Sequence, residues 1–198
     1  MGVFSMIGIC GLGLLMRRRP PVAAAAAPGT PGGRASERPF GMTPNRAQVV
    51  LSVSAVACCV AMAMPQVHIV AYCADLGYGA ARGAQMLSIV LGCGIISRLG
   101  FGLISDRIGG LRTLLLGGVL QAVALALFLP FDGLVSLFVI SALFGLFQGG
   151  IVPSYALVIR EYFPAGQAAT RVGDVLMFTL FGMALGGWMT GKVFALTG

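Results

Sequence analysis

The chain is 198 residues long, and 58% of its residues are hydrophobic while only 10% are charged. Its mean hydropathy of +0.94 excludes an ordinary soluble domain, in which about a quarter of the residues are charged. The net charge of +7 would suit a nucleic-acid-binding protein, but six arginines lie in one polar segment and most of the others lie in short loops. Membrane topology explains this distribution better than a phosphate-binding face, so we expect an integral membrane protein without a nucleic-acid partner.

The first segments of the chain are an apolar run and a polar linker. Val3–Met16 is short for a membrane span and has its arginines after the apolar run, so it resembles the end of a transmembrane helix more than a signal peptide. The stretch that follows is rich in Ala, Pro, Gly and Arg, which predicts a flexible linker. The predicted boundaries are a helix end at 1–16, a linker at 17–47 and a helical bundle at 48–198.

Five longer apolar segments follow, each long enough to cross the hydrocarbon core as a helix. They predict an all-α polytopic membrane bundle with short loops. The predicted spans are Gln48–Tyr72, Ala84–Ser105, Thr113–Pro130, Leu134–Ile159 and Val172–Leu196.

The basic residues predict the orientation of this bundle. Ten of them lie in the linker, in the loop around Asp106 and in the loop 160–171, which share one side because two spans separate each from the next. The other side holds only Arg82 and Lys192. By the positive-inside rule the linker is cytoplasmic, which predicts a multi-pass protein of the plasma membrane, or of the inner membrane of a bacterial cell.

The loop around Asp106 carries the most specific motif. It places a glycine, an Asp-Arg pair, a second glycine and a further arginine between two apolar runs, at Gly102, Asp106, Arg107, Gly109 and Arg112. This pattern resembles the loop signature of the major facilitator superfamily, although Gly110 and Leu111 stand where that family usually has basic residues. The resemblance implies a cytoplasmic latch whose charge pairs hold one conformation of a transporter. Asp106, expected just past the end of a helix, can pair with an arginine and interact with the N-terminal dipole of the helix that follows. The alternative is a solvated loop that only sets topology.

A second motif supports the same family. Arg160 and Glu161 begin the sequence REYFP, which is followed after a short gap by Arg171-Val-Gly173. It occupies the place of the family's cytoplasmic loop between the tenth and eleventh helices. The resemblance therefore implies the C-terminal half of a transporter built from two six-helix bundles, without the last helix. The implied partner is the N-terminal half.

Catalytic and metal-binding patterns are not recognisable in the sequence. It has one histidine, no carboxylates paired in one segment and no phosphate-binding loop. The five cysteines show no metal or redox spacing and are interpreted as small apolar residues of the helices. We therefore expect neither an enzyme nor a cofactor.

Arg98 is the leading candidate for binding a solute. It lies eight residues before Asp106, about 12 Å along a helix, and a charge near mid-bilayer costs at least about 2.5 kcal/mol, so such groups usually face a bundle interior or an aqueous cavity. The alternative is that Arg98 extends to the membrane surface. Arg98, Gly102 and Asp106 also resemble the eighth helix of the monocarboxylate and oxalate/formate branch, in which an arginine pairs with the substrate carboxylate. Gly94 departs from that branch, because many monocarboxylate porters have an acidic residue there.

Four further polar residues are candidates for the same site. Gln66 and His68 follow Pro65 in the first complete span, while Gln148 and Tyr155 lie seven residues apart on about one face of a later span. Their alternatives are an interfacial histidine and ordinary hydrogen bonds between helices. The sequence thus predicts secondary transport of a small solute, most simply an organic anion such as a monocarboxylate, by alternating access. The rival interpretation is a truncated membrane remnant that does not transport.

Overall fold

The computed structural model describes residues 39–197, so the predicted helix end at 1–16 and most of the predicted linker lie outside the described residues. The described part is all-helical, as predicted, and contains five helical spans long and apolar enough to cross a membrane. Its elements are η1 (Pro39–Gly41), α2 (Pro44–Asp75), α3 (Ala80–Ile108), α4 (Gly110–Leu127), α5 (Leu134–Gln148), α6 (Ile151–Tyr162) and α7 (Ala165–Thr197).

Most helices extend beyond the predicted apolar runs, because polar residues continue the helical turns at the ends, whereas α4 ends at Leu127, before the predicted limit at Pro130. The last predicted linker residues already belong to α2, which begins at Pro44. Asp106 was expected just past a helix end, but α3 continues to Ile108, so Asp106 lies in its last two turns. The chain reverses at Gly109, whose φ of 86° is favourable only for glycine. α3 therefore ends there and does not continue into α4.

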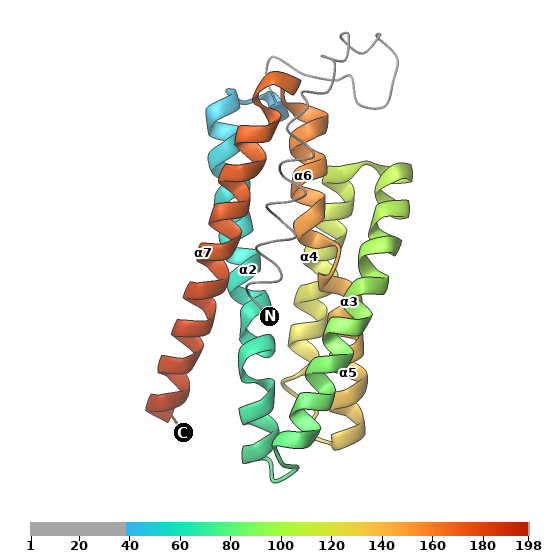
Figure 1. The fold of residues 1–198 in the computed structure, drawn as a ribbon, viewed down its shortest axis with the longest axis vertical. Helices are drawn as coiled ribbons and strands as arrows, with labels where there is room; N and C mark the ends of the chain where they lie inside the picture. Colours follow the sequence, from blue (N-terminus) through green and yellow to red (C-terminus); the bar gives the residue numbers. More distant parts are fainter. Residues whose placement is uncertain (1–38, 198) are drawn as a thin grey trace, which may run out of the picture. The chain divides into compact units, whose positions relative to one another are not determined.

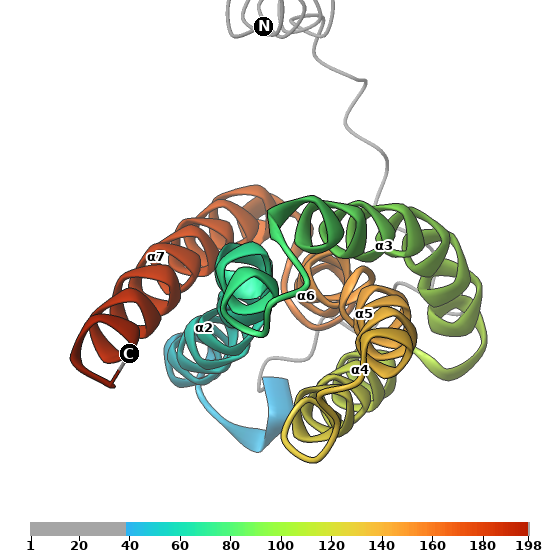
Figure 2. The ribbon, with the colours of Figure 1, turned by 90° about the horizontal axis from the view of Figure 1, so that it is seen from below.

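The five spans alternate in direction, and α5 and α6 together form one of them. α2 packs along α7, α3 packs along α5, and α4 packs against both α5 and α6. Figure 1 shows the start of α2, the α3–α4 turn and the α6–α7 turn at one end of these helices. We call this the basic end, because it carries Arg46, Arg107, Arg112, Arg160 and Arg171. The α2–α3 and α4–α5 loops lie at the opposite end (Figures 1 and 2).

Glycines allow the closest helix contacts. A Cβ atom at Gly182 of α7 would lie 2.9 Å from the Cα of Val56 in α2, and one at Gly149 would lie 2.8 Å from the Cα of Gly94 in α3. These distances leave no room for a side chain. The α2–α7 and α5–α3 pairs therefore depend on small residues, as is usual for helices packed within a membrane.

The span predicted as Leu134–Ile159 is interrupted at Gly149 and Gly150, between α5 and α6. Pro153 has no N–H to donate to the carbonyl group of Gly149 four residues earlier, so one helical hydrogen bond is lost there. Ser154 caps the break by donating both its N–H and its hydroxyl to the carbonyl of Gly150, at 3.2 and 2.7 Å. The interruption thus has a local cause in the sequence.

The interior of the bundle is apolar at both ends, and the outside is apolar as well. Leu51 and Tyr155 belong to the buried cluster nearer the basic end, whereas Met86 and Leu137 belong to the cluster nearer the opposite end. Outward-facing residues include Leu99, which is 72% exposed. An apolar exterior of this kind is compatible with lipid, not with water.

Candidate functional site

Arg98 lies on the exposed side of α3. Its neighbours Ser97 and Phe101 are buried against the other helices, whereas Ile95 and Leu99 are exposed together with Arg98. Among residues 39–197, Arg98 has no hydrogen-bond or ion-pair partner. The guanidinium group is therefore free to bind an anion that approaches this face of α3.

Gln66 and Gln148 are the two predicted site residues that the fold brings into contact. The amide Nε2 of Gln66 on α2 donates to Oε1 of Gln148 at the end of α5, at 3.0 Å. Gln148 is only 4% exposed. The sequence placed both in the site but did not predict that they bond to each other.

His68 and Tyr155 lie apart from that pair. The Nε2 atom of His68 is 3.4 Å from the carbonyl oxygen of Gly187 on α7, and its ring stacks on Phe194 with centroids 6.3 Å apart. Tyr155 is 2% exposed and packs in the core with residues of α2 and α4. His68 therefore contacts α7, and Tyr155 is enclosed.

The predicted loop motif is mostly exposed. Asp106, Arg107 and Arg112 point outward and form no hydrogen bond or ion pair with any residue from 39 to 197. A Cβ atom added at Gly102 would meet no atom within 4 Å, and Gly109 has the positive φ that ends α3. In this conformation the motif supplies free charges and a turn.

Glu161 of the second motif instead makes the contact between the two loops. Its Oε1 and Oε2 atoms accept hydrogen bonds from the N–H of Gly110, at 3.0 and 3.1 Å. Gly110 is the first residue of α4, so a carboxylate from the end of α6 binds the positive end of the α4 dipole. The sequence pointed to both loops but assigned the helix-dipole contact to Asp106.

Arg171 ties the start of α7 to the start of α2. Its guanidinium group lies 4.8 Å from the ring centre of Phe163 and donates to Oε1 of Gln167 and to Oδ1 of Asn45, at 3.0 and 3.4 Å. Its backbone carbonyl accepts from Nε2 of Gln48 at 3.1 Å. Arg160, by contrast, is exposed and has no partner among the described residues.

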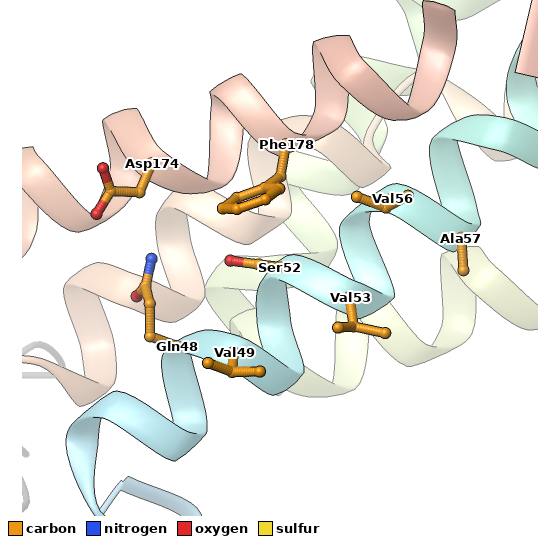
Figure 3. A pocket seen from close by; sticks show the side chains of 8 residues that line it. All are labelled: Gln48, Val49, Ser52, Val53, Val56, Ala57, Asp174 and Phe178. Atoms are coloured by element: carbon orange, nitrogen blue, oxygen red, sulfur yellow. The ribbon is translucent and has the colours of Figure 1, made fainter. Parts of the chain in front are cut away.

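A groove lies between α2 and α7, near these contacts. It has a volume of about 520 Å³, and Figure 3 shows Asp174 and Phe178 on the α7 side facing residues of α2. Asp174 is exposed and lies towards the basic end of α7. The sequence analysis did not single out this acidic residue, although it lies within a predicted span. The α2 side is lined by Gln48, Val49, Ser52, Val53, Val56 and Ala57. None of the five predicted solute-binding residues lines this groove.

Metal binding has no support in the described part of the chain. Within residues 39–197, no three side chains of His, Cys, Asp or Glu are grouped closely enough to hold a metal ion. Cys59 and Cys73 are buried, and Cys73 Sγ lies 3.4 Å from Met86 Sδ. These two cysteines thus occupy packing positions.

Comparison with known proteins identifies a family model that matches most of the chain. The model of the Major Facilitator Superfamily matches residues 1–194. Monocarboxylate transporter 13 of Rattus norvegicus is 31% identical over 137 residues, which cover 68% of this chain and 32% of the rat protein. The bovine (Bos taurus) protein of the same name is 28% identical over a segment of the same length.

A plant protein is similar over more of the chain. The Probable anion transporter 2, chloroplastic, of Oryza sativa subsp. japonica is 30% identical over 176 residues, which cover 86% of this chain and 30% of the rice protein. The chain thus spans about a third of the length of these relatives. No solved structure gives a significant match.

Proposed function

This chain belongs to the Major Facilitator Superfamily, a family of membrane transporters and not of enzymes, and we propose that it forms part of a secondary transporter for a small organic anion. A monocarboxylate is the solute that the observations favour. Two relatives are named monocarboxylate transporters and a third is named an anion transporter. The side chain that carries the proposal is Arg98.

Arg98 suits this role because it combines a membrane-embedded position with a free charge. It lies within α3, more than two turns from the last residue of that helix, and has no partner in residues 39–197. An unpaired arginine in a span is costly unless it meets water or an anion. A carboxylate solute that binds Arg98 through two parallel hydrogen bonds would offset that cost.

The neutral polar residues are proposed as secondary contacts. Gln66 and Gln148 bond to each other, His68 contacts α7, and Tyr155 is enclosed in the core. Their amide, imidazole and hydroxyl groups become available to a solute when the helices move apart. Arg98 supplies the charge, and these groups supply orientation.

The proposed mechanism is alternating access between two bundles. In this family the solute site lies near the membrane midplane, between two halves of the protein. We assign residues 48–198 to the C-terminal bundle, 17–47 to the linker and 1–16 to the end of the preceding helix. The exposed face of α3 that carries Arg98 would then face the N-terminal half, which is the proposed partner.

The proposed orientation places the basic end in the cytoplasm. Five arginines lie at this end of the described helices, and the arginines of the linker precede it in the chain. Arg82 and Lys192 lie at or near the opposite end. The positive-inside rule therefore places the Glu161–Gly110 contact on the cytoplasmic side of a plasma membrane.

Uptake of a labelled monocarboxylate tests the role of Arg98. The chain is combined in liposomes with the N-terminal six-helix bundle of a relative such as rat Monocarboxylate transporter 13, and initial rates are compared for Arg98→Gln, Arg98→Lys and the original chain. Loss of a charge-assisted hydrogen bond predicts that Arg98→Gln lowers kcat/KM by about 10- to 100-fold, with a smaller loss for Arg98→Lys.

Arg82→Gln is the matched control, because Arg82 is an exposed arginine near the start of the same helix. It should leave uptake nearly unchanged. An equal effect of Arg82→Gln and Arg98→Gln would contradict a solute-binding role for Arg98. Absence of any uptake from correctly inserted protein would favour the rival interpretation, a remnant that does not transport.

A further inference from the structure

Two spans each lose one helical hydrogen bond at a proline. Pro65 in α2 has no N–H, so the carbonyl group of Ala61 has no α-helical partner. Pro153 has the same effect on the carbonyl group of Gly149, where α5 ends before α6 begins. Each site is a point at which a helix bends or moves at lower cost than elsewhere.

A glutamine flanks each of these sites, and the two glutamines bind each other. Gln66 follows Pro65 directly, and Gln148 precedes Gly149 directly. The hydrogen bond from Gln66 Nε2 to Gln148 Oε1 measures 3.0 Å and is partly buried. A single polar contact therefore joins the two weak points.

Further contacts join the same two segments towards the opposite end. The hydroxyl of Tyr72 near the end of α2 donates to Oδ1 of Asp132 at 3.2 Å, and Asp132 lies two residues before α5. The hydroxyl of Tyr78 donates to the carbonyl oxygen of Asp132 at 3.0 Å. Between these bonds and the glutamine pair, Ile69 of α2 and Leu137 of α5 belong to one buried cluster.

We propose that the Gln66–Gln148 hydrogen bond couples the two sites of missing helical hydrogen bonds, at Pro65 and at Gly149–Gly150, so that residues 66–75 of α2 and α5 move together as one segment pair. The pair is joined at one end by the two glutamines and at the other by Tyr72 and Asp132, and both segments contribute to a buried cluster that also contains Met86 of α3. A rearrangement at Pro65 must therefore be accompanied by one at Gly149–Gly150. This role goes beyond solute contact, the role proposed above for the two glutamines. Its use in opening a solute pathway rests on the proposed function, but the coupling itself does not.

Hydrogen–deuterium exchange of the full chain in liposomes tests the coupling. The variants are Gln66→Met, Gln148→Met and the double variant, because methionine keeps the length of the side chain but cannot replace the amide hydrogen bond. Exchange is followed in peptides that cover 61–75 and 134–154. The control is Gln121→Met, which removes the bonds between Gln121 and Cys58 but lies at neither of the two sites.

Coupling predicts a reciprocal result. Each single substitution raises exchange in both peptides by about 3- to 18-fold, which corresponds to the average and the largest coupling free energies known for hydrogen bonds between membrane helices. The double variant exchanges no faster than the single ones. Gln121→Met raises exchange near Cys58 and in α4, and not in 134–148.

Three results would overturn the proposal. One is faster exchange only in the helix that carries the substitution, and another is an additive effect in the double variant. The third is an equal rise throughout the chain, including α7, which would show a general loss of packing. Because exchange is measured without transport, a chain that couples its helices but gives no uptake contradicts only the proposed function.

Discussion

At the residue scale, the charged side chains of the basic end divide into bonded and free groups. Glu161 binds the N–H of Gly110, and Arg171 is held by Gln167, Asn45 and the ring of Phe163. Asp106, Arg107 and Arg112 have no partner in residues 39–197. The bonded groups stabilise this conformation, and the free groups remain available for another one.

Glu161→Gln should destabilise the helices. The glutamine keeps one acceptor oxygen but loses the negative charge that interacts with the α4 dipole, so we expect a loss of about 0.5 to 1 kcal/mol. Unfolding of the purified chain in mixed micelles measures this loss. Asp174→Asn is the control, since Asp174 is exposed and forms no hydrogen bond or ion pair among the described residues. An equal effect of both substitutions would contradict the specific role of Glu161.

Asp106→Asn should affect transport more than stability, in contrast to Glu161→Gln. Because Asp106 is exposed and unbonded, its removal costs little stability in this conformation. If Asp106 forms a latch in another conformation, the substitution should lower the turnover of the chain combined with an N-terminal bundle. It should lower the amount of protein in the membrane less. Uptake divided by the immunoblot signal measures this. An equal fall in both quantities would indicate a role in folding or insertion.

The sequence identified the loops but could not assign this contact. Glu161 and Gly110 are 51 residues apart, and the partner is a backbone N–H group that every residue except proline offers. Asp106 is adjacent to the turn and was therefore the natural choice for the dipole contact. Only the packing of α4 against α6 shows which carboxylate reaches that N–H.

At the scale of the helices, the glycines of α5 and α7 set how closely their partners approach. The closest contacts involve the backbones of α2 and α3, which cannot move aside as a flexible side chain does. A methyl group at such a position forces the two helices apart. A methyl group on the open side of the same helix does not.

Gly182→Ala and Gly173→Ala in α7 should therefore differ in sign. A Cβ at Gly182 would lie 2.9 Å from the Cα of Val56, so we expect a loss of about 1 to 3 kcal/mol. Gly173 has no atom within 4 Å of that position, and alanine there should stabilise the helix by about 0.5 to 1 kcal/mol. Unfolding of both variants in mixed micelles is the measurement. A similar loss for both would show that close packing is not what requires Gly182.

The spans were predictable because apolar length alone determines whether a helix crosses a membrane. The break at Gly149–Gly150 was not predicted, since apolar residues continue on both sides of it and Pro65 in α2 does not divide that helix. Pro153 differs from Pro65 because two adjacent glycines lie three and four residues before it. This pair of glycines is the sequence signal for the break. The Gln66–Gln148 bond depends on tertiary packing and leaves no pattern in the sequence.

At the scale of the whole molecule, the distribution of arginines predicts the orientation in the membrane. Single cysteines at Ser36 in the linker and at Ala80, the first residue of α3, are placed in a cysteine-free background. An impermeant thiol reagent added to intact cells should label position 80 and not position 36, because the linker side is cytoplasmic. Labelling of position 36 but not 80 would reverse the orientation.

The exposed face of α3 defines what the bundle requires from a partner. Arg98 lies there without a counter-ion in the described part of the chain, and the surrounding residues are apolar. A site built between two bundles is incomplete when only one is present. The isolated chain should consequently associate with other helices and transport nothing.

Saturable uptake of a labelled monocarboxylate into liposomes tests this account most directly. Three samples are compared: the chain alone, the N-terminal six-helix bundle of a relative alone, and both together. The account predicts saturable uptake only when both are present, and its loss with Arg98→Gln. Saturable, Arg98-dependent uptake by the chain alone would contradict it, because a working pore would then form without the second bundle.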